Sequence, residues 1–327
     1  MSMRLSVHRE SWPMRAPFAI TGHVFESLES VVVGLEHEGA IGRGEGVPVY
    51  YLQEEARGLL DQIEAIRPAI EAGIGRDDLQ SLLPPGGARN AVDCALWDLE
   101  ADRAGKTIWE LTGISPAARR TAYTLGIQDT PELMAEQAAR ASGYPLLKIK
   151  LNGDAPVERI AAIRKARPDA EIIIDANQGF TMDLLRRVLE PFAELGVAMV
   201  EQPLPRGGDA ELEGLSSPIP LCADESCLHR GELPDALKRY DMINIKLDKT
   251  GGLTEALALA TEARQAGKGL MVGNMLGTSL SMAPAFVIAQ LCDFVDLDGP
   301  LNLKSDLPGG MVYRDGEVAA PQTGLWG

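Results

Sequence analysis

The first third of the chain alternates between apolar and polar positions, and this alternation predicts antiparallel strands. The strand segments are residues 3–12, 29–39 and 40–50, with glycines expected to break the pattern into turns. Apolar positions three and four residues apart then predict helices over residues 53–73 and 88–113. These segments together predict an N-terminal α+β domain over residues 1–115.

Beyond Thr121 the pattern changes to short apolar strands that alternate with amphipathic helices. Eight strands are predicted, over residues 121–127, 146–151, 171–177, 197–203, 219–226, 241–247, 269–275 and 293–299. A polar residue near the strand end recurs roughly every 25 residues, about the length of one βα unit, and eight such units close a barrel. The predicted fold is therefore α/β, a modified (β/α)₈ (TIM) barrel over residues 116–300 with the first domain as its cap.

The remaining residues, 301–327, do not continue the barrel pattern. Residues 300–327 carry three prolines and several glycines, so the last barrel helix is expected to be shortened or replaced. We expect this C-terminal segment to return to the capping domain.

Composition excludes several classes of protein. The chain has 327 residues and 45% hydrophobic content, which is enough for a large core. Its net charge of -16 and its lack of a basic block make nucleic acids and anionic membranes poor partners. Four irregularly spaced cysteines fit a reducing cytosol, and no apolar run is long enough to cross a bilayer, so we expect a soluble, cytoplasmic protein. The expected partner is a small-molecule substrate, for which the residues described below provide the evidence. Whether copies of the chain form a homo-oligomer stays open.

Two lysines stand inside one predicted strand, 146-LLKIKL-151. Side chains alternate faces along a strand, so the ammonium groups of Lys148 and Lys150 point the same way. Their burial is costly, because each group loses water and also repels its neighbour. We therefore expect a functional site to use them.

Carboxylates stand near the ends of three consecutive predicted strands, at Asp175, Glu201 and Asp224. The active site of such a barrel lies at the carboxyl ends of its strands, so these side chains are expected to converge. Carboxylate oxygens without histidine are hard ligands that suit Mg²⁺ better than zinc. One such acid alone could cap a helix or form a salt bridge, but the periodic placement of all three favours a magnesium site.

A second lysine pair is predicted across the barrel, with Lys150 on the second strand facing Lys246 on the sixth. A neighbouring ammonium lowers the pKa of a lysine and lets it act as a base, and Lys148 is such a neighbour of Lys150. Lys249 follows the sixth strand and is expected to be a loop or surface charge.

Two bases around a substrate carboxylate held by Mg²⁺ predict removal of the proton α to that carboxylate. One lysine takes the proton and the other returns one from the opposite face, so the product is the epimer. Three other functions stay open: a Schiff-base aldolase, a lyase that expels a β-leaving group, and a metal-binding scaffold without catalysis.

A set of short motifs makes the chain similar to a known family. They are 89-RNAVDCALWDLEADRAGK-106, 148-KIK-150, 175-DAN-177, 201-EQP-203, 223-ADES-226 and 244-NIKLDKTGG-252. With them the whole chain resembles the enolase superfamily, muconate-lactonizing subgroup, and most closely its dipeptide epimerases. Enzymes of that superfamily use a lysine or histidine base with Mg²⁺. The mandelate-racemase subgroup is disfavoured, because it carries a histidine after its seventh strand and none lies near residues 269–275 here.

This resemblance implies a role for each motif. The metal ligands would be Asp175, Glu201 and Asp224, and the acid/base pair would be Lys150 and Lys246, assisted by Lys148. The residues that adjoin the ligands are expected to hold their geometry. These residues are Asn177, Gln202 and Glu225.

Asp296 and Asp298 on the eighth strand favour a dipeptide epimerase over the subgroup's cycloisomerases, o-succinylbenzoate synthases and N-acylamino acid racemases. In dipeptide epimerases a D-x-D here holds the substrate's α-ammonium group. Thr124 and Phe25 complete the expected substrate-binding set. Members acting on Ala-Glu carry an arginine where Phe25 stands, and Arg15 lies nearby in the sequence. Ala-Glu and dipeptides with an apolar second residue therefore both stay open.

Overall fold

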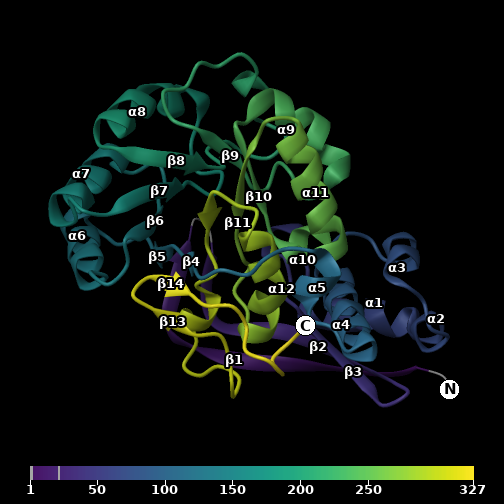
Figure 1. The fold of residues 1–327 in the computed structure, drawn as a ribbon. Helices are drawn as coiled ribbons and strands as arrows, with labels where there is room; N and C mark the ends of the chain where they lie inside the picture. The colour runs from purple at the N-terminus through teal and green to yellow at the C-terminus, as the bar shows by residue number, and fades with distance from the viewer. Residues whose placement is uncertain (1–2, 21–22) are drawn as a thin grey trace.

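An antiparallel sheet of three strands forms one layer of the N-terminal domain (Figure 1). The computed structural model, which describes residues 3–20 and 23–327, places β1 at Arg4–Ile20, β2 at His23–His37 and β3 at Ala40–Gly46. Val31 and Val33 alternate with less buried residues along β2 and have no exposed surface. The predicted antiparallel strands are confirmed, although β1 runs well beyond residue 12.

The glycines of β3 do not make turns, and in this respect the prediction was wrong. Gly42, Gly44 and Gly46 alternate along the strand on one face. A Cβ atom on any of them would lie 2.1 Å from a carbonyl oxygen of α4 (Gly87–Ala104). Glycine is needed because the backbone of the helix lies directly on the strand.

The two helices predicted in this domain are each divided. α1 (Ala56–Ala65) ends before α2 (Arg67–Glu71), because Pro68 has no N–H group to continue the helical hydrogen bonds. α4 is separated from α5 (Ile108–Thr112) by Gly105, which has a left-handed conformation with φ 59°. A helix that was not predicted, α3 (Arg76–Leu82), lies between α2 and α4 in the chain.

Eight parallel strands form the second sheet, in the order of the sequence. They are β5 (Tyr123–Leu125), β6 (Leu146–Lys150), β7 (Glu171–Asp175), β8 (Val197–Glu201), β9 (Leu221–Ala223), β10 (Met242–Ile245), β11 (Gly269–Val272) and β12 (Phe294–Val295). Each strand lies inside a predicted segment. The sheet curls until its two edges meet, where the Ala122 N–H donates to the Val295 carbonyl oxygen at 2.7 Å.

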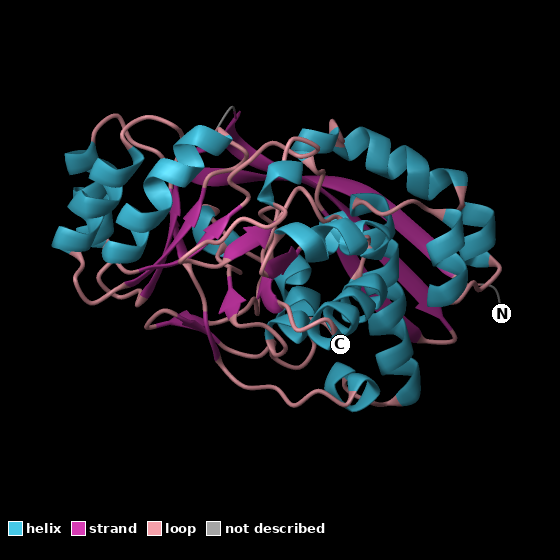
Figure 2. Cartoon of the chain, turned by 90° about the horizontal axis from the view of Figure 1, so that it is seen from above, coloured by secondary structure: helices cyan, strands magenta, loops and turns pink. Residues whose placement is uncertain are grey.

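Helices connect these strands and lie around the outside of the sheet (Figure 2). The α-helices are α6 (Pro131–Arg140), α7 (Pro156–Ala166), α8 (Met182–Glu194), α9 (Leu233–Arg239), α10 (Leu247–Thr250), α11 (Leu253–Gln265) and α12 (Ser279–Ala289). Short 3₁₀ helices occur at η1 (Tyr50–Leu52), η2 (Ala210–Leu212), η3 (Arg230–Glu232) and η4 (Gly299–Asn302). Among the described residues, η4 is the only helix that follows β12.

The C-terminal segment lies against the N-terminal domain. Two short strands, β13 (Tyr313–Arg314) and β14 (Glu317–Val318), first pair with β4 (Arg119–Arg120). The Trp326 indole N–H then donates to the Cys94 carbonyl oxygen at 3.1 Å. The Ile108 N–H donates to the carbonyl oxygen of Gly327 at 2.6 Å.

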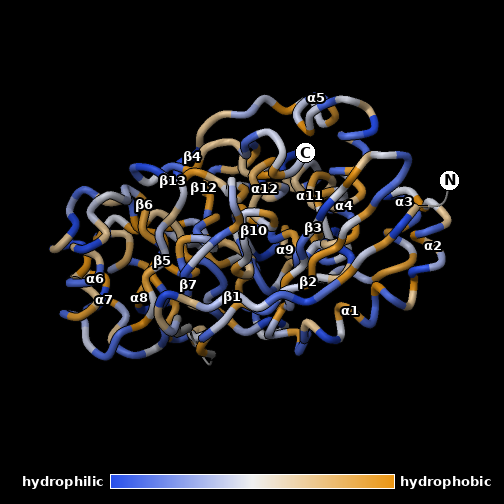
Figure 3. The backbone as a smooth tube through the Cα atoms, turned by 90° about the horizontal axis from the view of Figure 1, so that it is seen from below, coloured by the Kyte–Doolittle hydropathy of each residue, from blue (hydrophilic) through white to orange (hydrophobic). Residues whose placement is uncertain are grey.

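The interior of the barrel is apolar at its N-terminal end. Inward-facing side chains of successive strands form one buried cluster there: Ala122, Leu146, Ile173, Met199, Cys222, Met242 and Met271. In Figure 3, hydrophilic and hydrophobic stretches alternate along the chain, and hydrophilic stretches run along β1 and β2 as well as through turns. In the described part of the chain, no helix combines the length and apolar character that a membrane span requires.

Candidate active site

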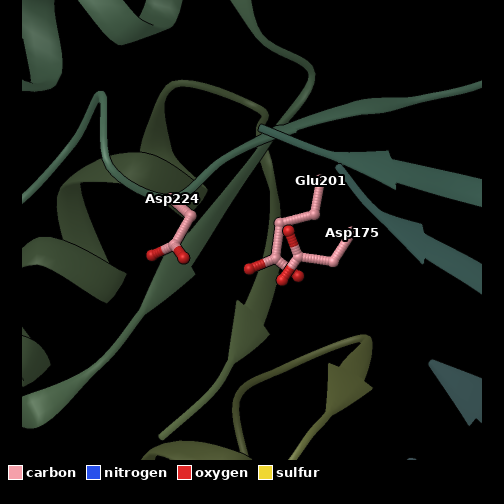
Figure 4. Close-up of side chains that lie close together, drawn as sticks. All are labelled: Asp175, Glu201 and Asp224. Carbon is pink, nitrogen blue, oxygen red and sulfur yellow. The ribbon is translucent and has the colours of Figure 1, made fainter. Parts of the chain in front are cut away.

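Three carboxylates meet at the C-terminal end of the barrel. Asp175 and Glu201 are the last residues of β7 and β8, and Asp224 directly follows β9. Parallel strands end at the same edge, so side chains of neighbouring strand ends extend toward one another, as Figure 4 shows. One oxygen of each lies within 4.8 Å of the others, and all three residues are fully buried.

The oxygens of this triad are suited to a divalent cation. The Asn244 amide N–H donates to Glu201 Oε1 at 2.6 Å. Glu201 Oε2 lies 2.8 Å from Lys148 Nζ, and within the described residues this ion pair is its only contact with a donor. A carboxylate oxygen has two lone pairs, so Glu201 Oε2 can also bind a cation. Hard oxygen ligands in this number fit Mg²⁺.

The pKa values of these acids diverge. Burial opposes ionisation of Asp175, but the ammonium groups of Lys150 and Lys148 outweigh it and lower the pKa to about 2. Two lysines likewise outweigh burial at Asp224 and lower its pKa strongly. Burial and the charge of Asp175 raise the pKa of Glu201 to about 7. Negative charge is therefore crowded around Glu201, and a bound cation would relieve that crowding.

The lysine pair of β6 contacts the triad from one side. Lys150 Nζ donates to Asp175 Oδ2 at 2.7 Å and to Asn177 Oδ1 at 2.9 Å. Lys148 Nζ lies 3.1 Å from Asp175 Oδ2 and donates to Asp296 Oδ2 at 2.9 Å. Burial lowers the pKa of Lys148, but the surrounding carboxylates outweigh this and raise it well above its usual value. Lys148 is therefore held as a cation.

The lysines of the sixth barrel unit contact the triad from the other side. Lys246 Nζ donates to Asp224 Oδ2 at 2.7 Å. Burial lowers the pKa of Lys246, but Asp224 outweighs it and the net pKa is raised. Lys249 is not a surface charge, contrary to the prediction: it is buried, and its Nζ donates to Asp224 Oδ1 at 2.5 Å. Lys246 caps α10 and Lys249 lies three residues later on that helix, so both point the same way.

A cavity of about 540 Å³, including its open mouth, lies next to the triad. Lys148, Lys150, Lys246 and Asp224 line its polar side. The capping side is mostly apolar or aromatic and consists of Phe25, Tyr50, Tyr51, Met275 and Leu276. The last four were not predicted as site residues from the sequence, although Tyr50 ends the third predicted strand and Tyr51 directly follows it. The lysines and the aromatic residues therefore share one enclosed space.

The two acids beyond β12 line the same cavity. β12 is shorter than predicted, so Asp296 and Asp298 follow the strand. The Thr124 N–H donates to Asp298 Oδ2 at 2.8 Å, and the Thr124 hydroxyl donates to Asp296 Oδ1 at 3.4 Å. Burial and the charge of Asp296 raise the pKa of Asp298 to about 7. Within the cavity, these two carboxylates form a second acidic site, which Lys148 links to the triad.

The residues that adjoin the triad differ in their contacts. Gln202 Oε1 accepts hydrogen bonds from the backbone N–H groups of Asp224 and Ser226, each at 3.0 Å. Asn177 accepts from Lys150, and its own N–H donates to Asp175 Oδ1 at 2.9 Å. Glu225 lines the cavity, and neither of its carboxylate oxygens has a hydrogen-bond partner among the described residues.

Phe25, which was expected to line the substrate pocket, lies at the cavity wall. Phe25 packs edge-to-face on Tyr50, with ring centroids 5.6 Å apart. Arg15 is exposed, and its Nε donates to the Leu303 carbonyl oxygen at 2.7 Å. Within the described part of the chain, no arginine lines this cavity.

Relatives of this chain share its length. An L-Ala-D/L-Glu epimerase from Escherichia coli strain K12 is 45% identical over 317 residues, covering 96% of this chain and 98% of that protein. An N-acetyl-D-glutamate racemase from Pseudoalteromonas is 40% identical over 299 residues, covering 91% of this chain and 95% of that protein.

Solved structures share the fold. An enolase family member from Agrobacterium tumefaciens with homology to dipeptide epimerases, containing sodium and L-Ala-L-Glu, has a TM-score of 0.96 and 43% identity over 99% of this chain and 100% of that chain. A dipeptide epimerase from Methylococcus capsulatus, complexed with Mg and L-Arg-D-Lys, has a TM-score of 0.92 and 30% identity over 100% of this chain and 99% of that chain.

Family models match both halves of the chain. Residues 2–113 match the model for the mandelate racemase / muconate lactonizing enzyme N-terminal domain. Residues 133–325 match the model described as enolase C-terminal domain-like. The resemblance seen in the sequence is therefore confirmed, and the chain belongs to the mandelate racemase / muconate lactonizing enzyme family of the enolase superfamily.

Proposed function

We propose that the chain is a magnesium-dependent epimerase that inverts the α-carbon beside the free carboxylate of a dipeptide. The observation that carries this proposal is the placement of two lysines on either side of the triad. Lys150 contacts Asp175 from β6, and Lys246 contacts Asp224 from the end of β10. The names of the E. coli and M. capsulatus proteins also support it.

The residues of this chain would divide the work as follows. When bound to Asp175, Glu201 and Asp224, Mg²⁺ supplies positive charge that offsets the charge developing on the substrate carboxylate as the α-proton leaves. One of Lys150 and Lys246 accepts that proton, and the other donates a proton to the opposite face of the carbon.

Two neighbouring contacts would support these proton transfers. Sharing Asp224 with a cation weakens the carboxylate charge that holds Lys246 protonated, and so favours the neutral amine that a base requires. Lys148 stays charged among its carboxylates and keeps positive charge beside Lys150.

The charge of the site favours a zwitterionic substrate. Six buried carboxylates and four buried lysines lie in or beside the cavity, and burial and neighbouring negative charge raise the pKa values of Glu201, Glu225 and Asp298 to about 7 or 8. The carboxylates are Asp175, Glu201, Asp224, Glu225, Asp296 and Asp298, and the lysines are Lys148, Lys150, Lys246 and Lys249. The backbone of a dipeptide carries one positive and one negative end and leaves the net charge of the site unchanged. An N-acylated amino acid adds uncompensated negative charge, which a buried site disfavours.

A second candidate, an N-acylamino acid racemase, is favoured by the name of the Pseudoalteromonas relative. The ammonium group of the substrate separates the two functions. Asp298→Asn should lower kcat/KM for dipeptides with a free amine by a factor that corresponds to about 2–5 kcal/mol, because the ammonium group of the substrate loses a charged partner. N-acetylated analogues should be affected far less. If the parent protein prefers N-acylated substrates, or if the variant loses both types equally, the racemase takes the place of the epimerase.

The second residue of the dipeptide is expected to be apolar or aromatic, because Phe25, Tyr50 and Leu276 line the capping side of the cavity. Phe25→Arg should raise kcat/KM for L-Ala-L-Glu relative to L-Ala-L-Leu by about tenfold, since a buried ion pair replaces an apolar contact. Val24 is 55% exposed and lies on the other face of β2, so Val24→Arg is the matched control. An unchanged preference in Phe25→Arg would remove this residue from the substrate pocket.

A further inference from the structure

One motif of the N-terminal domain, 89-RNAVD-93 on α4, lies against the segment that carries Lys246. Arg89 is buried, and its guanidinium donates to the carbonyl oxygens of Thr250 at 2.6 Å and Gly251 at 3.1 Å. These carbonyl groups lie at the C-terminal end of α10, where a cation also complements the helix dipole. α4 therefore fixes one end of α10 through Arg89.

The other end of α10 is fixed through Asp248. Its Oδ1 atom accepts a hydrogen bond from the Asn90 amide at 2.7 Å and from the Val47 N–H at 2.8 Å. Both donors belong to the N-terminal domain, and Asp248 is 3% exposed. Lys246 and Lys249 flank this residue, so the hydrogen bonds to Asp248 act at the centre of the lysine-bearing segment.

Two glycines after α10 allow α4 to come this close. Gly251 and Gly252 have φ values of +77° and +112°. A Cβ atom on Gly251 would lie 2.4 Å from Arg89 Nε, and one on Gly252 would lie 2.4 Å from Asp93 Cβ. Any other residue would be strained in conformation and would also push α4 away. The motifs 89-RNAVD-93 and 250-TGG-252 are therefore complementary surfaces of one contact.

The contact leads directly to the proposed reaction. α4 holds Asp248, the segment around Asp248 carries Lys246 and Lys249, and both lysines bind Asp224 at 2.5–2.7 Å. Lys150 is reached by none of these bonds, because it lies on β6 and contacts Asp175 and Asn177. We infer that Asn90 is a positioning residue for Lys246, so that the N-terminal domain sets the geometry of one base and leaves the other independent.

This inference rests on the proposed function and predicts an asymmetric defect. In D₂O, Asn90→Ala should slow α-proton exchange from one epimer by about 10- to 100-fold, because a displacement near 1 Å has effects of that size. That epimer is the one whose exchange Lys246→Ala abolishes. Exchange from the other epimer, through Lys150, should change less than about threefold.

Matched variants separate positioning from a general loss of structure. Asp248→Asn keeps an acceptor for Asn90 and Val47, so it should exchange both epimers like the parent, whereas Asp248→Ala should repeat the asymmetric defect. Trp97→Phe removes a different bond of α4, from the indole N–H to Thr254 Oγ1 at 3.0 Å, and should leave the ratio of the two rates unchanged. Asn90→Ser is the milder variant if Asn90→Ala does not fold. An equal loss for both epimers, or no loss, would overturn the inference.

Amide hydrogen exchange tests the positioning without any substrate. In Asn90→Ala, the peptide that covers residues 246–252 should exchange faster by about tenfold, and the peptide that covers β6 should not change. If amide exchange in residues 246–252 is unchanged in Asn90→Ala, Asn90 does not position this segment, whether or not the protein acts on dipeptides. Faster exchange there, in a protein that acts on no dipeptide, would support the positioning role and reject only the proposed function.

Discussion

Chelation of divalent cations should abolish the α-proton exchange of dipeptides, and Mg²⁺ should restore it. Asp175, Glu201 and Asp224 lie within 4.8 Å of one another. Without the cation, the charge that develops on the substrate carboxylate loses its direct electrostatic stabilisation, and a loss of several kcal/mol corresponds to a rate decrease on the order of 10³-fold or more. Proton NMR in D₂O measures the exchange before chelation, after it, and after Mg²⁺ is returned.

Replacing a carboxylate of the triad should also abolish α-proton exchange, while the protein remains folded. Asp224→Ala should remove activity and also weaken Mg²⁺ binding measured by calorimetry, because it removes a ligand. Asp293 lies at the opposite end of the barrel, where its carboxylate accepts the Leu270 N–H at 2.8 Å. Asp293→Asn is thus a control that should bind Mg²⁺ like the parent. Full activity after exhaustive chelation would contradict the metal-assisted mechanism.

Removal of either base should lower the rate of epimerisation by about 10²- to 10⁴-fold, which is the usual contribution of one general acid or base. Each variant should nevertheless keep the exchange that the other lysine performs. Lys150→Ala and Lys246→Ala should therefore exchange the α-proton of opposite epimers, because the two amines approach the triad from opposite sides. Exchange is followed by NMR with each epimer supplied separately.

An exposed lysine provides the control for this comparison. Lys238 pairs with Asp235 on the surface of α9, so Lys238→Ala should epimerise at the parent rate. If Lys150→Ala or Lys246→Ala also epimerises at that rate, the assignment of two bases is wrong. If both lose the same epimer, they act on one face and the product forms by another route.

Periodicity explains why the triad could be expected from the sequence. Asp175, Glu201 and Asp224 recur about one βα unit apart, and parallel strand ends meet at one edge regardless of the details of packing. Each acid lies at a strand end or one residue beyond it. The same reasoning brought Lys148 and Lys150 to the site, because a β-strand places alternate residues on one face.

Contacts made after a strand ends could not be expected in the same way. Lys249 follows β10 in a single helical turn whose direction depends on α4, a helix far earlier in the chain. The spacing of three residues between Lys246 and Lys249 was the one feature of the sequence that could have placed Lys249 on the same side as Lys246. The glycines of β3 were misjudged for a related reason, since close packing on α4 and a turn favour the same residue. Both errors concern packing on α4, by β3 within the N-terminal domain and by α10 from the barrel.

The apolar cluster at the N-terminal end of the barrel limits how substrate and product can enter and leave the cavity. Buried side chains such as Ile173, Met199 and Met271 fill the N-terminal end, so among the described residues no passage leads downward from the cavity. Substrate and product must therefore share the open mouth of the cavity. A change that narrows this entrance slows arrival and departure alike, so it should lower the forward and reverse rates by one common factor. The width of the mouth can limit how fast the two epimers interconvert, but it cannot alter their ratio at equilibrium.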